Sequence, residues 1–175
     1  MAGTYEKIDT NLLTSAVGSF AFTSIPGTYT DLIIMTSIQG QSNGANVQIW
    51  FNNDGAGTAY SNTVLYSASS TAYSGRTTNA AKINFGTNGG MPFQNANQFG
   101  TNIWNIQNYS NATTYKTVFG TSRSPNGGYL NAQELDAAVG IWRNTAPITQ
   151  INIGIDNSKL MQPGSRFTIY GIKAA

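Results

Sequence analysis

Residues 148–155 read Ile-Thr-Gln-Ile-Asn-Ile-Gly-Ile, and this stretch decides the fold class. Ile151, Ile153 and Ile155 recur at every second position, with a polar or small residue between each pair. A period of two is typical of a β-strand that buries one face. Residues 166–172 alternate in the same way. The sequence therefore predicts a protein built of strands with one side against a core.

Outward from these two stretches, short apolar segments alternate with turn clusters along the chain. The run at 29–38 is the longest and is rich in β-branched residues, which favours a central strand. Other expected strands lie at 4–10, 17–22, 47–51, 62–67, 81–85, 99–107, 115–122 and 135–142. No stretch predicts a helix that could connect parallel strands, so the strands should pair antiparallel. We expect an all-β, two-sheet antiparallel sandwich of jelly-roll type, a single domain over residues 1–175 with a short N-terminal strand or arm.

Three segments are expected to lie outside the strands. The sequence Asn-Asn-Asp-Gly at 52–55 suits a hairpin turn. Residues 67–79 are rich in Ser, Thr and Ala and predict a loop, and residues 86–98 have no period at all. Long loops without secondary structure tend to be functional. The residues that we expect to contact neighbouring subunits are Thr4, Tyr5, Met91, Pro92 and Phe93.

The composition replaces charge with neutral polarity. Only 9% of the residues are charged, against about 25% in ordinary globular proteins. Because burying an ion at an interface costs several kcal/mol, a surface of amides and hydroxyls suits contact with other subunits. The net charge is +2 and the basic residues are scattered, whereas nucleic-acid binding usually needs a basic stripe. No signal peptide or membrane-spanning run is visible, so we expect synthesis in a cytoplasm.

The chain contains no His and no Cys. Ser–His and Cys–His catalysis and the usual zinc sites are therefore excluded. Glu134 and Asp136 stand two residues apart and would share one face of a strand, as a carboxylate pair of a glycosidase could; we interpret them as two exposed strand charges. Aromatic side chains that could stack on sugar rings, although they are more often core residues, are Tyr29, Trp50, Tyr60, Tyr66, Tyr73, Tyr109, Tyr115 and Tyr129.

Five blocks of the sequence carry a recognisable pattern: TYEKIDT at 4–10, FAFTSIPGTYTDLII at 20–34, VQIWFN at 47–52, GIWRNTAPITQINI at 140–153 and SRFTIYGIK at 165–173. In order and content they resemble a family of small virion structural proteins of tailed bacteriophages. The blocks span nearly the whole chain, except for a middle part at about 68–132. The resemblance implies a jelly-roll protein on the outer surface of a phage particle, made in the host cytoplasm. It transfers no catalytic residue.

Together, resemblance and composition predict a capsid decoration (cement) protein that stabilises the head. Its expected partners are copies of itself, as a homotrimer, and the major capsid protein of the phage. The alternative is a tail or fibre component that recognises a host-surface glycan through exposed aromatic side chains. A more remote alternative is a polysaccharide hydrolase that uses Glu134 and Asp136. We expect no enzymatic activity, cofactor, bound metal, nucleic-acid partner or membrane partner.

Overall fold

The computed structural model describes residues 4–41, 46–68, 71–85, 98–124 and 134–173. Within these ranges the chain forms twelve β-strands and no helix. The strands are, in chain order, β1 (Tyr5–Leu12), β2 (Ser19–Phe22), β3 (Asp31–Ile38), β4 (Val47–Phe51), β5 (Tyr60–Ala68), β6 (Thr71–Ala80), β7 (Ile83–Phe85), β8 (Gly100–Gln107), β9 (Lys116–Ser124), β10 (Glu134–Trp142), β11 (Ile151–Ile155) and β12 (Arg166–Ile172).

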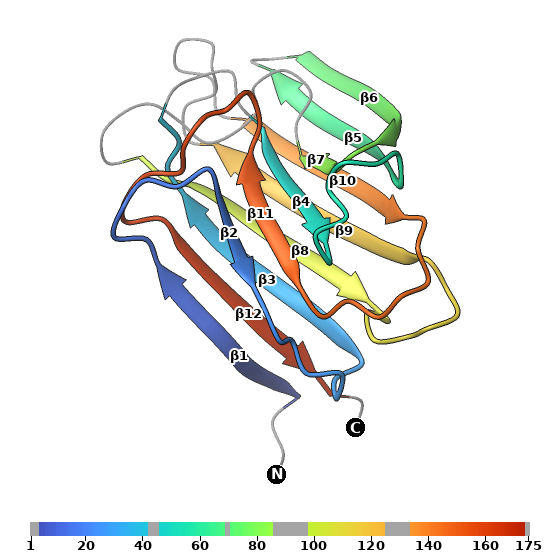
Figure 1. The fold of residues 1–175 in the computed structure, drawn as a ribbon. Helices are drawn as coiled ribbons and strands as arrows, with labels where there is room; N and C mark the ends of the chain where they lie inside the picture. The colour runs from blue at the N-terminus through green and yellow to red at the C-terminus, as the bar shows by residue number, and fades with distance from the viewer. Residues whose placement is uncertain (1–3, 42–45, 69–70, 86–97, 125–133, 174–175) are drawn as a thin grey trace.

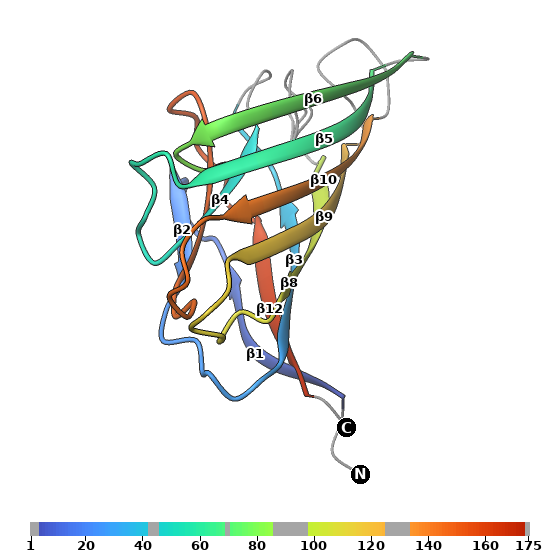
Figure 2. The same cartoon turned by 90° about the vertical axis from the view of Figure 1, so that its right-hand side faces the viewer.

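The strands form two antiparallel sheets. The large sheet has eight strands in the order β1-β12-β3-β8-β9-β10-β5-β6, and the small sheet has four in the order β2-β11-β4-β7. The small sheet covers part of one side of the large sheet (Figure 1). Turned by 90°, the two sheets are seen as separate layers (Figure 2). The expected all-β, jelly-roll-like sandwich is confirmed, and the strand predicted at 29–38 occupies an interior position as β3.

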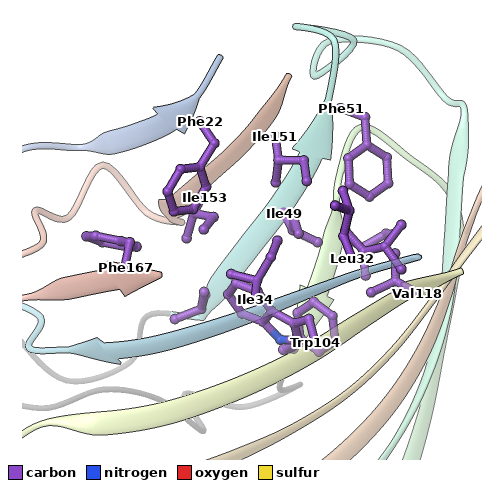
Figure 3. Close-up of a cluster of buried hydrophobic side chains, with 14 of the residues drawn as sticks. Phe22, Leu32, Ile34, Ile49, Phe51, Trp104, Val118, Ile151, Ile153 and Phe167 are labelled. Carbon is purple, nitrogen blue, oxygen red and sulfur yellow. The ribbon is translucent and has the colours of Figure 1, made fainter. Parts of the chain in front are cut away.

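The core lies between the two layers and is made of large apolar side chains. Figure 3 shows side chains of the small sheet pointing at side chains of the large sheet. Phe22, Ile49, Phe51, Ile151 and Ile153 come from the small sheet, and Leu32, Ile34, Trp104, Val118 and Phe167 come from the large one. Each is at most 2% exposed. Burying a side chain of this size stabilises the fold by about 1.5–3 kcal/mol.

Glycines on the inner side of the large sheet make room for these side chains. A Cβ atom at Gly120 would lie 2.2 Å from Cδ1 of Trp104. A Cβ atom at Gly140 would lie 2.7 Å from Cδ1 of Ile83. These inner positions of β9 and β10 are therefore occupied by glycine, because the Trp104 and Ile83 side chains fill the space beside them in the close-packed core.

The segment at 52–55 connects the two sheets and is not a hairpin turn, because β4 and β5 belong to different sheets. The Asp54 N–H donates to the Phe51 carbonyl at 2.8 Å. Asn52 and Asn53 are therefore the central residues of the turn, with φ of 48° and 59°, whereas the sequence suggested Asp54 and Gly55. Asp54 instead accepts a hydrogen bond from Trp142 Nε1 at 2.8 Å.

The loop predicted at 67–79 is wrong over most of its length, since β6 covers Thr71–Ala80. This strand pairs on one side only, with β5, and lies at the edge of the large sheet. Most of its side chains are exposed, so no alternation of apolar and polar residues marks it in the sequence. Tyr66 and Tyr73 stack across the hairpin with ring centroids 5.2 Å apart.

Candidate functional site

The side of the large sheet that faces away from the small sheet, its outer face, carries exposed apolar side chains. Six large ones are between 41% and 61% exposed. They come from β3, β5, β8, β9 and β10 and are Met35, Leu65, Ile103, Phe119, Leu135 and Val139. Contiguous exposed apolar surface on a protein usually marks an interaction site.

The strand register brings these side chains together. Met35 is directly opposite Ile103, and Phe119 is directly opposite Val139. Side chains at directly opposed positions have Cβ atoms about 4.5–5.5 Å apart and touch. A depression of about 300 Å³ adjoins Val139 on β10. The register therefore places two apolar pairs in adjacent cross-strand rows of the middle strands, with Thr121 opposite Ile103 and Asn105 opposite Phe119.

The charges on this outer face are mostly positive and lie toward its margins, with Arg123 directly opposite Leu135. By register, four cations share the face: Lys7, Arg76, Arg123 and Arg166. Among the described outer-face positions of β3 to β10, the one carboxylate is Asp31, and it accepts a hydrogen bond from the Asn108 N–H at 2.7 Å. The outer face thus combines an apolar centre with a basic border.

The subunit-contact residues predicted from the sequence lie partly at the margin of this face. Tyr5 begins the edge strand β1, opposite Ile172, and is 61% exposed. The Thr4 carbonyl accepts a hydrogen bond from the Lys173 N–H at 3.2 Å, which extends the pairing of the neighbouring strands β1 and β12 (Figure 1). Met91, Pro92 and Phe93 lie outside the described residues. The contact role of all five stays a prediction.

Asp136 is not the exposed strand charge that the sequence suggested. It is 2% exposed and points to the inner side of the large sheet, where Ser122 Oγ donates to Asp136 Oδ2 at 3.1 Å. The Glu134 side chain lies outside the described part of the chain. In the same cross-strand row, Asn102 Nδ2 donates to Thr36 Oγ1 at 2.8 Å. Asp136 therefore belongs to a buried polar row.

A second feature is a groove of about 580 Å³ over the outer side of the small sheet. Trp50 is half-buried here, outside the core. A Cβ atom at Gly154 would lie 3.1 Å from Cη2 and Cζ3 of its indole, and one at Gly55 would lie 2.7 Å from Cδ1. The Lys82 ammonium lies 4.2 Å from the centroid of the ring, a favourable cation–π distance. The two glycines and Lys82 thus hold the indole in the groove.

A tight turn at 156–159 forms another wall of the groove. The Lys159 N–H donates to the Asp156 carbonyl at 3.1 Å, and the two central residues, Asn157 and Ser158, both have φ of 56°. A serine in this left-handed region is uncommon. The Asp156 carboxylate accepts hydrogen bonds from Asn46 N at 2.7 Å and Nδ2 at 2.8 Å, which fixes the turn to the start of β4.

Two of the aromatic residues considered for sugar binding belong to the core, and one lines the groove. Tyr60 and Tyr109 are completely buried; the hydroxyl of Tyr60 accepts from the Phe51 N–H at 2.9 Å. Burial raises the pKa of both tyrosines. Tyr129 lies outside the described residues. Among the members of the set that the structure describes, Trp50 is the one that lines the groove.

The fold also changes the pKa values of Glu6 and Lys116. Glu6 accepts hydrogen bonds from Lys173 Nζ at 2.8 Å and from the Tyr29 hydroxyl at 3.1 Å. The bond from Lys173, followed by the one from Tyr29, lowers the pKa of Glu6. Burial lowers the pKa of Lys116, whose Nζ donates to the carbonyls of Thr114 at 2.6 Å and Thr145 at 3.1 Å.

No cluster of metal-binding side chains and no helix able to cross a membrane occurs among the described residues. No protein-family model matches the chain, and no curated protein matches it.

Sequence reasoning included Trp50 among its candidates but missed the outer face of the large sheet. In β9 the apolar residue Phe119 follows the apolar residue Val118, so one of the two must face away from the core. The sequence alone does not say which of the two sides of the strand is covered.

Proposed function

We propose that this chain is a structural protein of a bacteriophage particle that docks on other subunits through the outer face of its large sheet. The specific form of the proposal is a capsid decoration protein bound to the major capsid protein. The single observation that carries it is the exposed apolar surface formed by residues such as Ile103 and Phe119. The sequence blocks that resemble phage virion proteins point to the kind of assembly.

The outer face supports docking because it does not serve the fold of the isolated chain. Val118 and Trp104, on the inner side of the same strands, are fully buried, whereas Phe119 is 52% and Ile103 is 41% exposed. A covered Phe or Ile side chain gains about 1.5–3 kcal/mol over an exposed one. Several such side chains on one surface supply the apolar centre that a stable interface needs.

The charge of the face favours a partner with a carboxylate-bearing border. Arg76, Arg123 and Arg166 would repel the same residues of a second copy packed face to face, and opposite charges across an interface steer association. We therefore assign this face to a different protein, an acidic capsid surface. A homotrimer of this chain, as proposed from the sequence, would use another surface.

The test is binding to particles that lack the protein. The double variant Ile103→Asp, Phe119→Asp should fold normally but bind at least tenfold more weakly, because it places carboxylates in the apolar centre. Ala56→Asp, at an exposed position between β4 and β5, is the control and should bind normally. Unchanged binding of the double variant would refute the proposed interface.

Copy number in purified particles separates the capsid form of the proposal from the tail form. A ratio to the major capsid protein near one, or a simple fraction of it, supports decoration of the head. A number close to that of the tail proteins supports the tail or fibre alternative. The proposal includes no catalytic step, and cleavage of a polysaccharide by the purified chain that is lost on Glu134→Ala would contradict it.

A further inference from the structure

We propose that the groove over the outer side of the small sheet binds an acidic saccharide, one that carries carboxylate groups on its sugar rings. The groove lies on the opposite layer of the sandwich from the outer face of the large sheet. The inference is therefore independent of the docking role proposed above, and either one can fail alone.

The position of Trp50 is the first argument. Its side chain projects from β4, where the neighbouring residues Ile49 and Phe51 are fully buried in the core. The glycines at 55 and 154 leave the space that the indole fills. An indole held partly exposed in a groove, rather than in the core, offers apolar ring atoms to the C–H groups of a sugar wherever the Lys82 ammonium, 4.2 Å from the ring centroid, does not cover it.

The polar groups around the indole are the second argument. Gln48, Ser19 and Ser158 line the same groove and bring amide and hydroxyl groups, which donate to and accept from sugar hydroxyls. Gln48 Nε2 donates to Asn84 Oδ1 at 2.7 Å, so its amide is oriented before a ligand arrives. A site that combines an apolar wall with a few fixed polar groups is typical of small-ligand recognition.

The charges decide the class of saccharide. Lys82 and Lys159 both line the groove. Within the described part of the chain, the only salt bridge joins Lys173 and Glu6, so neither groove lysine has a carboxylate partner there. The one acid in the wall, Asp156, has both oxygens engaged by Asn46. The two ammonium groups are therefore placed for a ligand carboxylate, the group with which lysine forms charge-assisted hydrogen bonds.

The test uses the fluorescence of the intact protein. Of the three tryptophans, Trp104 and Trp142 are at most 1% exposed, so a ligand-induced change in emission reports on Trp50. The probe is oligogalacturonate, and its methyl ester is the matched neutral saccharide. We expect a saturable change in emission with oligogalacturonate, weaker at high salt because the charges are near the surface. Trp50→Phe should abolish the change.

Each of Lys82→Gln and Lys159→Gln should weaken binding of oligogalacturonate by about tenfold, as expected for the loss of one charge-assisted hydrogen bond. Lys7→Gln and Arg166→Gln, on the large sheet, are the controls and should bind normally. Thermal unfolding of every variant shows whether it is folded. If Trp50→Phe is not folded, the two lysine variants still test the proposal.

Four results would overturn the inference. They are no change in emission at ligand concentrations up to about 1 mM, equal affinity for the methyl ester, unchanged affinity in both lysine variants, and displacement of the oligosaccharide by an equal concentration of inorganic phosphate. The last result would identify the groove as a phosphate site instead.

Discussion

The outer sides of the two sheets differ in chemistry although both face away from the same core. The large sheet presents apolar side chains such as Ile103 and Phe119 with cations at the border. Beside the end of β4 and the start of β11 in the small sheet, amides bond to one another: Gln150 Nε2 donates to Asn53 Oδ1 and to Asn152 Oδ1, both at 2.9 Å. An amide network that is already satisfied needs no partner, whereas exposed apolar side chains gain by being covered.

The neutral composition of the chain thus serves a different purpose on each sheet. On the small sheet, the hydrogen-bonded amide of Gln48 lines the groove together with the two lysines. On the large sheet, the lack of charge at the centre leaves an apolar surface. A single percentage of charged residues therefore describes two surfaces that we expect to bind different partners, one a protein and one a saccharide.

The largest expected effect tests whether the outer face of the large sheet is dispensable for folding. Val118→Asp buries a carboxylate without a partner at a fully buried position and should lower the free energy of unfolding by more than about 4 kcal/mol. Phe119→Asp, one residue further on the opposite side, should lower it by about 1 kcal/mol or less. Urea denaturation measures both. Equal losses would mean that the outer face is part of the folding core.

The next prediction compares Gly120, on the inner side of the large sheet, with Gly154, on the outer side of the small sheet. Gly120→Ala forces a methyl group into Trp104, at a distance of 2.2 Å without movement, and should cost about 1–3 kcal/mol. Gly154→Ala meets the Trp50 indole and the Gly18 carbonyl at 3.1 Å. It should cost less in thermal unfolding, but it should change Trp50 emission and saccharide binding. A larger loss for Gly154→Ala would contradict this order.

A third prediction concerns the amine of Lys116, which is buried on the inner side of the large sheet. The centre of the outer face of the same sheet carries no charge. Its pKa in the folded protein lies below the unfolded value near 10.5. Below the folded pKa the protonated amine destabilises the fold, and as the pH rises toward 10.5 the folded state releases its proton first. The contribution of Lys116 to stability should therefore rise in that range, against the loss that the raised pKa values of Tyr60 and Tyr109 cause as the pH passes about 10.

Lys116→Met should remove this increase, and Lys7→Met, at the exposed edge of the large sheet, should leave it unchanged. Thermal unfolding from neutral pH to pH 10.5 checks both variants. A parallel pH dependence of Lys116→Met and the unmodified protein would show that another group causes the increase.

The smallest effect concerns the edge of the large sheet, where Glu6 pairs with Lys173. Because the pKa of Glu6 is lowered in the fold from 4.5, its stabilisation is complete above pH 4.5 and is lost as the pH falls through the lower folded value. The Lys173 side chain is 42% exposed and the Glu6 side chain is 38% exposed, so water screens the pair. Glu6→Gln should slightly reduce the acid dependence of unfolding, and no further reduction should follow when Lys173→Met is added.

Much of the fold could be predicted because apolar residues alternate where a strand has one buried side. The strands at 47–51 and 166–172 match β4 and β12 residue for residue. β6 was missed because an edge strand with exposed side chains has no burial pattern. β11 begins later than expected because Asn52 Oδ1 accepts the N–H groups of Thr149 and Gln150, which takes that stretch out of the ladder.

The sequence by itself determined that the chain is an antiparallel β-sandwich without His or Cys chemistry, because period and composition are local properties. Only the tertiary structure decided which side of each strand is covered. In β9, Gly120 faces the core and Phe119 faces outward, since Trp104 of the neighbouring strand fills the space beside the glycine. That choice depends on side chains far apart in the sequence, and it places Phe119 on the outer face of the large sheet.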